Sequence, residues 1–259
     1  MIIDSHAHIY PDKLAERAVA FVGGFYDLTP GCDGTVDTLL TAGRAAGIDR
    51  FVVHSAAQTP VQADSINQYI ASECQAHPEF IGFGTLHRDM DDPGGAVDRI
   101  LALGLKGVKL HPDMQKFNMD DEAMDGVYEA MAGRLPLLIH CGDYRYSYSH
   151  PARLARVLTR FPRLVVIGAH MGGWSVFDEA LAHLQDKFCY LDLSSSLMFL
   201  PPRRAEELIG LYGPERILFG SDYPMWDPVE ELERFYALRL SQSDREVILS
   251  GNALRLLGN

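Results

Sequence analysis

The chain has 259 residues, of which 47% are hydrophobic and 22% are charged, and its formal net charge is −12. This length and composition are typical of one globular α/β domain with a sizeable apolar core. The acidic balance argues against nucleic acid or an anionic membrane as the main partner. A small anionic substrate stays open, because a bound metal ion can reverse the local field.

Cysteine use and hydropathy indicate the compartment. The four cysteines, at positions 32, 74, 141 and 189, include no Cys-x-x-Cys pair, which is typical of a reducing environment. The N-terminal region has no basic segment followed by an apolar one, and no apolar stretch approaches the roughly 18 residues of a membrane span. We therefore predict a cytoplasmic protein.

Short apolar segments recur along the chain and predict strands that begin near residues 2, 50, 80, 106, 136, 164, 188 and 216. They are apolar throughout, as parallel strands covered on both faces are. Helical patterns such as residues 96–101 and 151–158 separate them. Eight such repeats predict a single-domain (β/α)8 TIM barrel over residues 1–259. A doubly wound open sheet, the alternative, would collect site residues from only two or three strands.

The interval between the first two predicted strands is the longest and holds an excess segment, residues 9–34. In a barrel this segment would leave the mouth directly after the first strand. Gly23 and Gly24 could act as hinges of a substrate lid. A surface helix followed by a turn explains the same residues equally well, so both interpretations stay open.

Histidine and aspartate stand at the ends of several predicted strands, where barrel enzymes keep their active sites. His6 and His8 are two residues apart on one strand, so their imidazoles face the same side and can hold one ion. His140 ends the fifth strand and Asp222 follows the eighth. We predict that these four residues bind one divalent ion, with Zn²⁺ expected and Mn²⁺, Fe²⁺ or Co²⁺ as alternatives.

Two of the strand-end residues are predicted to be catalytic. Asp222 could exchange a proton with a bound water as well as bind the metal. His170 ends the sixth strand and is expected to act without binding the ion, by stabilising an oxyanion or relaying a proton. Asp4 faces the same way as His6 but lies deeper, so we expect it to be a hydrogen-bonding partner rather than a ligand.

Lys109 and His111 form a second pair with side chains on one face of a strand. Lys109 could be carboxylated and bridge two metals, bind a substrate carboxylate, or pair with an aspartate such as Asp113. His111 could bind a second metal or line the pocket. The choice between one metal and two stays open.

Substrate-binding residues are expected in the loops after the fifth and sixth strands. Asp143, Tyr144 and Arg145 follow the fifth strand, and Trp174 follows the sixth. Arg145 could hold a substrate carboxylate through its two-pronged guanidinium.

Weaker candidates follow the remaining strands. His54 and His87, after the second and third strands, are expected to be structural or part of the pocket wall. Ser194, Ser195 and Ser196 could donate hydrogen bonds, but no nucleophile motif surrounds them.

Taken together, these motifs resemble the amidohydrolase superfamily, in particular the amidohydrolase-related branch that includes aminocarboxymuconate-semialdehyde decarboxylase. The matching pieces are residues 4–8, 107–112, 138–140, 169–173 and 219–224, in the family's order. The resemblance implies one zinc-type ion on His6, His8, His140 and Asp222. It also implies that His170 acts without binding that ion.

We expect a metal-dependent hydrolase, in which a metal-activated water attacks an amide, ester or lactone bond of a small polar substrate that can carry a carboxylate. The main alternative is non-oxidative decarboxylation, in which the metal holds a carboxylate and Asp222 or His170 handles a proton at carbon. A metal-free lactonase and a non-catalytic metal- or metabolite-binding barrel are further alternatives. A homo-oligomer is compatible with the outer helices of such a barrel, but nothing in the sequence selects a partner face.

Overall fold

The computed structural model describes residues 1–258. It contains eight strands, which begin within two residues of the predicted positions. They are β1 (Ile3–His8), β2 (Arg50–His54), β3 (Phe80–Thr85), β4 (Gly107–Leu110), β5 (Leu137–Ile139), β6 (Val166–Gly168), β7 (Tyr190–Asp192) and β8 (Ile217–Leu218).

The sheet has the connectivity of a (β/α)8 barrel. Its strand order is β1-β2-β3-β4-β5-β6-β7-β8, and the chain after β8 bonds back to β1. The Ser5 amide donates to the Phe219 carbonyl at 2.8 Å, and the Asp222 amide donates to the His6 carbonyl at 2.9 Å. The predicted fold class is thereby confirmed, and the doubly wound alternative is excluded because such a sheet has two open edges.

Helices follow the strands as the sequence pattern predicts. They are α1 (Asp12–Tyr26), α2 (Val36–Ala46), α3 (Ala63–Ala76), α4 (Pro93–Ala102), α5 (Pro112–Gln115), α6 (Asp125–Met131), α7 (Pro151–Arg160), α8 (Phe177–Leu184), α9 (Pro202–Tyr212), α10 (Pro228–Tyr236), α11 (Gln242–Glu246) and α12 (Asn252–Leu257). Side-chain caps start several of them: Thr35 accepts from the Thr38 amide before α2, and Asp227 accepts from the Val229 amide before α10. Within the described residues, no helix is long and apolar enough to cross a membrane.

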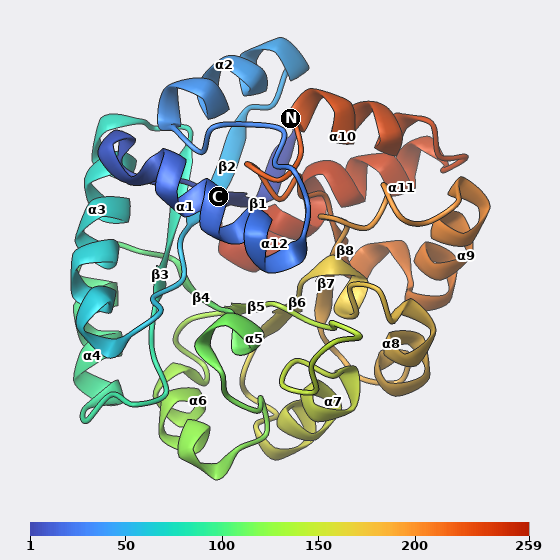
Figure 1. The fold of residues 1–259 in the computed structure, drawn as a ribbon. Coiled ribbons are helices and arrows are strands. Elements are labelled where there is room, and N and C mark those ends of the chain that lie inside the picture. Colours follow the sequence, from blue (N-terminus) through green and yellow to red (C-terminus); the bar gives the residue numbers. More distant parts are fainter. Residues whose placement is uncertain (259) are drawn as a thin grey trace. The chain divides into compact units, whose positions relative to one another are not determined.

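The chain divides into two compact units, which we describe separately. Unit 1 comprises Met1–His54 and Leu193–Asn259, and unit 2 comprises Ser55–Asp192. In unit 2, helices α3, α4, α6, α7 and α8 lie outside strands β3 to β7 (Figure 1). One domain over residues 1–259 stays a prediction.

In unit 1, the excess segment after β1 forms a helix and a turn, as one of the two interpretations predicted, and a role as a lid stays a prediction. Gly23 lies inside α1, where a Cβ atom would meet the Leu28 carbonyl oxygen and Pro30 Cδ at 2.8 Å. This glycine therefore lets the chain fold back closely over the helix. The turn that follows is held in place, since the Gly31 amide donates to the Met225 carbonyl at 2.9 Å.

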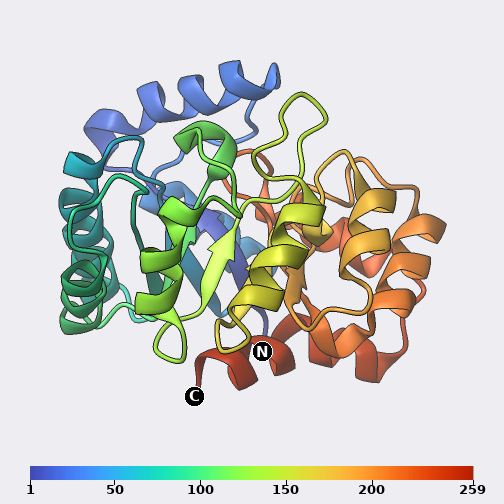
Figure 2. The same ribbon diagram turned by 90° about the horizontal axis from the view of Figure 1, so that it is seen from below.

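The C-terminal helices complete the same unit. The two chain ends lie near each other in both views (Figure 1, Figure 2). Asn252, the first residue of α12, donates from Nδ2 to the Ile217 carbonyl at 2.6 Å and to the Pro214 carbonyl at 2.8 Å. These bonds fix α12 to the start of β8.

A buried carboxyl in α10 gives the fold a pH dependence. Glu231 is 0% exposed, and its Oε1 accepts from Arg234 at 2.6 Å. Burial outweighs the attraction of Arg234 and, with smaller contributions from the charges of Asp222 and Asp4, raises the pKa of Glu231 from 4.5 to about 7. The folded chain therefore binds a proton at Glu231 more tightly than the unfolded chain does. The stability that comes from binding this proton is lost as the pH rises from 4.5 to about 7.

We expect Glu231→Gln to remove about 3 kcal/mol of this pH dependence from the free energy of unfolding. Urea denaturation of both proteins across this pH window measures it. Glu230→Gln is the matched control, because Glu230 is the exposed partner of the same Arg234, with a separation of 3.0 Å. A stability difference between wild type and Glu231→Gln that stays constant with pH would contradict this expectation.

Candidate metal centre

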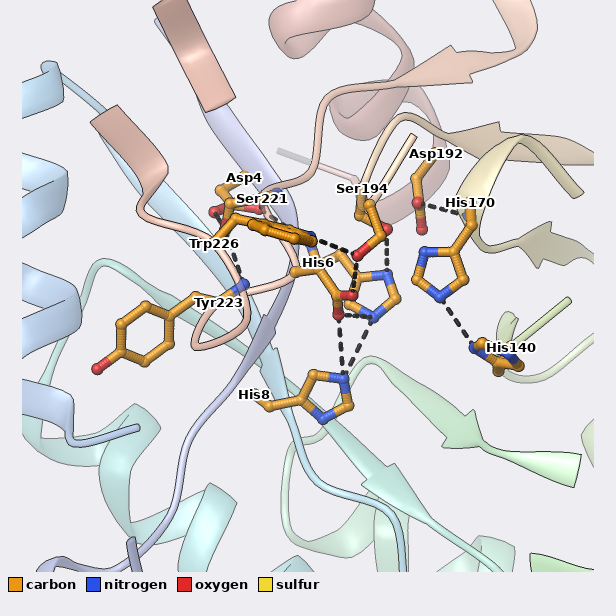
Figure 3. A network of polar contacts seen from close by, with 12 residues as sticks. Asp4, His6, His8, His140, His170, Asp192, Ser194, Ser221, Tyr223 and Trp226 are labelled. Carbon is orange, nitrogen blue, oxygen red and sulfur yellow. Dashed lines mark hydrogen bonds and ion pairs between the residues drawn. The ribbon is translucent and has the colours of Figure 1, made fainter. Parts of the chain in front are cut away.

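Three side chains of unit 1 converge where β1 and the chain after β8 meet. His6 Nε2 lies 3.3 Å from His8 Nε2 (Figure 3). Asp222 Oδ1 lies 3.2 Å from His6 Nε2 and 3.6 Å from His8 Nε2. Ligand atoms that share one zinc-type ion, each about 2.0–2.1 Å from it, are separated from one another by about 3.0–3.4 Å. Two imidazoles and a carboxylate at this spacing fit a divalent metal.

The local backbone explains how Asp222 reaches the histidines. An added Cβ at Gly220 would lie 2.9 Å from His6 Cβ, so only glycine lets the chain after β8 pass this close to β1. Asp222 itself has φ 62°, in the left-handed region, which aspartate tolerates better than most residues. Strained backbone of this kind is common at functional sites.

His6 is oriented from behind by a serine of unit 1. Ser194 Oγ lies 3.0 Å from His6 Nδ1, which leaves Nε2 facing His8 and Asp222. Asp4 acts as the hydrogen-bonding partner we expected, because it accepts from the Ser221 amide at 2.9 Å and from the Ser221 hydroxyl at 2.6 Å. It thereby ties β1 to the turn that carries Asp222.

Asp222 Oδ2 is held by residues that the sequence indicated only in part. Ser195 donates to it at 2.5 Å, and Trp226 Nε1 donates to Ser195 Oγ at 2.7 Å. The serine run was a candidate donor, whereas Trp226 was missed; its position four residues after Asp222 in the same loop was the available signal.

Tyr10 is a further buried side chain that the charge of Asp222 affects. Burial, followed by the charge of Asp222, raises the pKa of Tyr10, so this side chain stays a neutral phenol.

Loss of the Ser194 hydroxyl should weaken metal binding. We expect Ser194→Ala to lower the affinity for a divalent ion about 10- to 100-fold, because a partner that orients a ligating imidazole typically has this effect. Competition with a chromophoric chelator measures the affinity. Ser196→Ala is the control, since its hydroxyl bonds only to the Ser194 carbonyl oxygen among the contacts observed, at 3.1 Å. Equal affinities for Ser194→Ala and wild type would contradict the assignment.

His140 and His170 belong to unit 2. His170 Nε2 lies 2.9 Å from His140 Nδ1, and the His170 amide donates to Asp192 Oδ1 at 3.0 Å (Figure 3). The other nitrogen of His140 lies 3.1 Å from the Gly142 carbonyl oxygen and 3.4 Å from Asp113 Oδ2. Both nitrogens of His140 thus face partners within unit 2. Its role as a ligand and the catalytic role of His170 stay predictions.

His111 packs against His140 in a way that does not suit a shared ion. The two rings are stacked, with centroids 4.0 Å apart and planes 9° from parallel. The nitrogen lone pairs of an imidazole lie in its plane, so two stacked rings cannot both direct a lone pair at one ion. His111 Nδ1 instead accepts from the Met114 amide at 3.3 Å and caps α5.

Lys109 and Asp113 are both buried in unit 2. Asp113 accepts from Ser149 at 2.5 Å, and burial raises its pKa from 3.8 to about 7. Carboxylation of Lys109 and a second metal both stay predictions.

The four expected substrate-binding residues lie in neighbouring loops of unit 2. Arg145 donates to both oxygens of Asp143, at 2.9 and 2.7 Å, and its guanidinium lies 5.9 Å from the centre of the Trp174 ring. Tyr144 is 74% exposed. Because the buried Asp143 balances the charge of Arg145, this arginine would attract a carboxylate less strongly than an unpaired one.

A (β/α)8 barrel with a histidine pair on β1 and an aspartate after β8 has side chains that suit a divalent metal. The profile of the family described as Amidohydrolase matches residues 3–258, and the chain belongs to this family. The resemblance seen in the sequence is thereby confirmed.

Named relatives indicate the chemistry found among similar proteins. The chain is 26% identical over 241 residues to 2-amino-3-carboxymuconate-6-semialdehyde decarboxylase from Dictyostelium discoideum, an alignment covering 76% of this chain. It spans only 66% of the length of that relative.

Solved structures support the fold over the whole chain. An uncharacterised TIM-barrel protein from Bordetella bronchiseptica superposes with a TM-score of 0.81 at 23% identity, covering 99% of this chain and 98% of that one. A dihydroxybenzoic acid decarboxylase from Polaromonas sp. JS666, with bound manganese and the inhibitor 2-nitroresorcinol, gives 0.75 at 18% identity, covering 99% and 96%.

The expectation of a hydrolase acting on C–N or C–O bonds is wrong. The Dictyostelium relative and the Polaromonas enzyme are both decarboxylases, which matches the alternative. The physical reason for the error is that one metal site can serve both reactions. The grouping of His6, His8 and Asp222 suits a divalent ion, but it does not reveal whether water or a substrate carboxylate would take the open position on that ion. Zinc in particular is not shown, since manganese occupies the Polaromonas enzyme.

Proposed function

We propose that this protein is a metal-dependent, non-oxidative decarboxylase of a small carboxylic acid. The observation that carries the proposal is the convergence of His6, His8 and Asp222 at metal-ligand spacing. The decarboxylases among its relatives supply the reaction class. The substrate we favour is an aromatic or unsaturated acid, since its π system can accept a proton before the carboxylate leaves.

His6, His8 and Asp222 would hold the ion, with His140 as a further ligand. The proposal for His140 rests on its position after β5 and on the general convergence of strand ends at the mouth of a barrel. Zn²⁺ and Mn²⁺ both suit these donors. When bound, the ion supplies the positive charge that holds the substrate carboxylate.

Asp222 is the residue we assign to the proton transfer. Its Oδ2 is held by Ser195, so its carboxyl group keeps one orientation. In the forward reaction Asp222 gives a proton to the carbon that carries the carboxylate. The bond to that carboxylate then breaks, its electron pair restores the π system, and carbon dioxide leaves. One proton is consumed, and Asp222 regains it from solvent. His170 would assist by orienting the substrate.

The remaining roles follow from the surroundings. Arg145, Asp143, Tyr144 and Trp174 would contact the substrate from the loops of unit 2. None of the four cysteines forms a disulfide, which fits a cytoplasmic location.

The test is a product balance in isotopic water. The protein, loaded in turn with Zn²⁺ and Mn²⁺, is incubated with hydroxylated benzoic acids and unsaturated dicarboxylic acids labelled with ¹³C in the carboxyl group. We expect release of labelled carbon dioxide, deuterium from D₂O at the vacated carbon, and no ¹⁸O from labelled water in the organic product. Turnover that incorporates ¹⁸O and keeps the carboxyl label would overturn the proposal.

A further inference from the structure

A third buried histidine adjoins the pair on β1. His54 is the last residue of β2, where it pairs in register with His8. Neighbouring strands lie about 4.8 Å apart, so side chains at paired positions on one face meet. One ligand atom from each of His6, His8 and His54 lies within 4.8 Å of the others, and His54 is 0% exposed.

The orientation of the three rings suits a shared ion. The planes of His6 and His8 differ by 47°, those of His6 and His54 by 69°, and those of His8 and His54 by 88°. Because each ring points its lone pair along its own plane, rings tilted in this way can converge on one point. The stacked pair of His111 and His140, with planes only 9° apart, cannot.

We propose that His54 is a further ligand of the metal centre, so that unit 1 alone supplies three imidazoles and a carboxylate. This inference rests on the metal-binding part of the proposed function. It adds His54, which the sequence pattern predicted to be structural or part of the pocket wall. A hydrogen bond can join only two imidazoles, whereas a transition metal accepts lone pairs from several at once. A shared ion therefore accounts for the grouping of all three histidines, and a hydrogen bond does not.

The experiment measures binding rather than turnover. Metal-free wild type, His54→Phe and His54→Gln are titrated with Co²⁺, whose visible spectrum reports the ligand set, and with Zn²⁺ in competition with a chelator. His54→Phe keeps a ring that can pack against His8 but has no nitrogen to donate. His77→Phe is the control for loss of a histidine, since His77 lies after α3 in unit 2.

We expect both His54 variants to bind Zn²⁺ at least ~100-fold more weakly than wild type does. Loss of a residue that only hydrogen-bonds to a metal ligand weakens binding by up to about this factor. Their Co²⁺ spectra should differ from that of wild type, whereas His77→Phe should match wild type in both measurements. Thermal unfolding of the metal-free proteins checks the fold, and His54→Gln decides the matter if His54→Phe does not fold.

Unchanged affinity and spectrum in the folded variant would overturn the inference and leave His54 as a packing residue. That result would not affect the decarboxylase proposal. Conversely, a lack of carbon dioxide release would leave the Co²⁺ result valid. If wild type binds neither Co²⁺ nor Zn²⁺, the ligand role of His54 and the metal-dependent function both fail.

Discussion

Replacement of Asp222 by asparagine is expected to lower the rate of carbon dioxide release by about 10³- to 10⁴-fold, the upper range for loss of a positioned acid or base. The amide has nearly the same shape and can still accept the hydrogen bond from Ser195, but it cannot carry the transferred proton. The measurement is kcat at saturating metal and substrate. Metal content, determined in the same samples, separates loss of the proton carrier from loss of the ion.

Ser195→Ala provides the matched comparison. Ser195 donates to Asp222 Oδ2 at 2.5 Å, and the proposed reaction assigns it no proton transfer of its own, so we treat it as a positioning residue. We expect a drop in kcat of about 10- to 100-fold, as for one hydrogen bond to a charged group. If Asp222→Asn retained more activity than Ser195→Ala, the assignment of Asp222 as the proton carrier would be wrong.

Much of the fold could be predicted because its signals are local. Apolar runs such as Leu137–Ile139 have the length and composition of buried parallel strands, and their spacing leaves room for one helix each. For the segment after β1, the sequence alone could not decide between a lid and a surface helix followed by a turn. The decision depends on contacts with residues distant in sequence, such as the bond from Gly31 to the Met225 carbonyl.

In the candidate site, too, the residues with local sequence signals could be predicted, and those that depend on distant contacts could not. His6 and His8 could be paired from their spacing alone, since strand geometry sets which side chains share a face. Ser194 and Trp226 could not be assigned, because their roles arise from loops that meet only after folding. The reaction was the least predictable property, since a metal site of imidazoles and carboxylate serves several reactions.

Removal of the metal is expected to abolish activity, with a fall of at least ~10³-fold that Mn²⁺ or Zn²⁺ restores in wild type but not in His6→Gln. His6 Nε2 lies 3.3 Å from His8 Nε2 and 3.2 Å from Asp222 Oδ1. Of the three proposed ligand atoms, it is the one nearest to the other two, so its loss should disrupt the metal centre most. The control His77→Gln should be reactivated as wild type is.

For the same variants, we expect a metal-dependent change in Tm that can be measured without a substrate. An ion that binds only the folded chain stabilises it by about 2.7 kcal/mol at a concentration 100 times its Kd. We therefore expect Zn²⁺ or Mn²⁺ to raise the Tm of metal-free wild type and of His77→Gln, but not that of His6→Gln. Because β1 and the chain after β8 would both contribute ligands, a bound ion would join two segments that are far apart in the sequence, and we expect it to slow unfolding of unit 1. A His6→Gln protein that gained as much stability as wild type would show that the ion binds elsewhere.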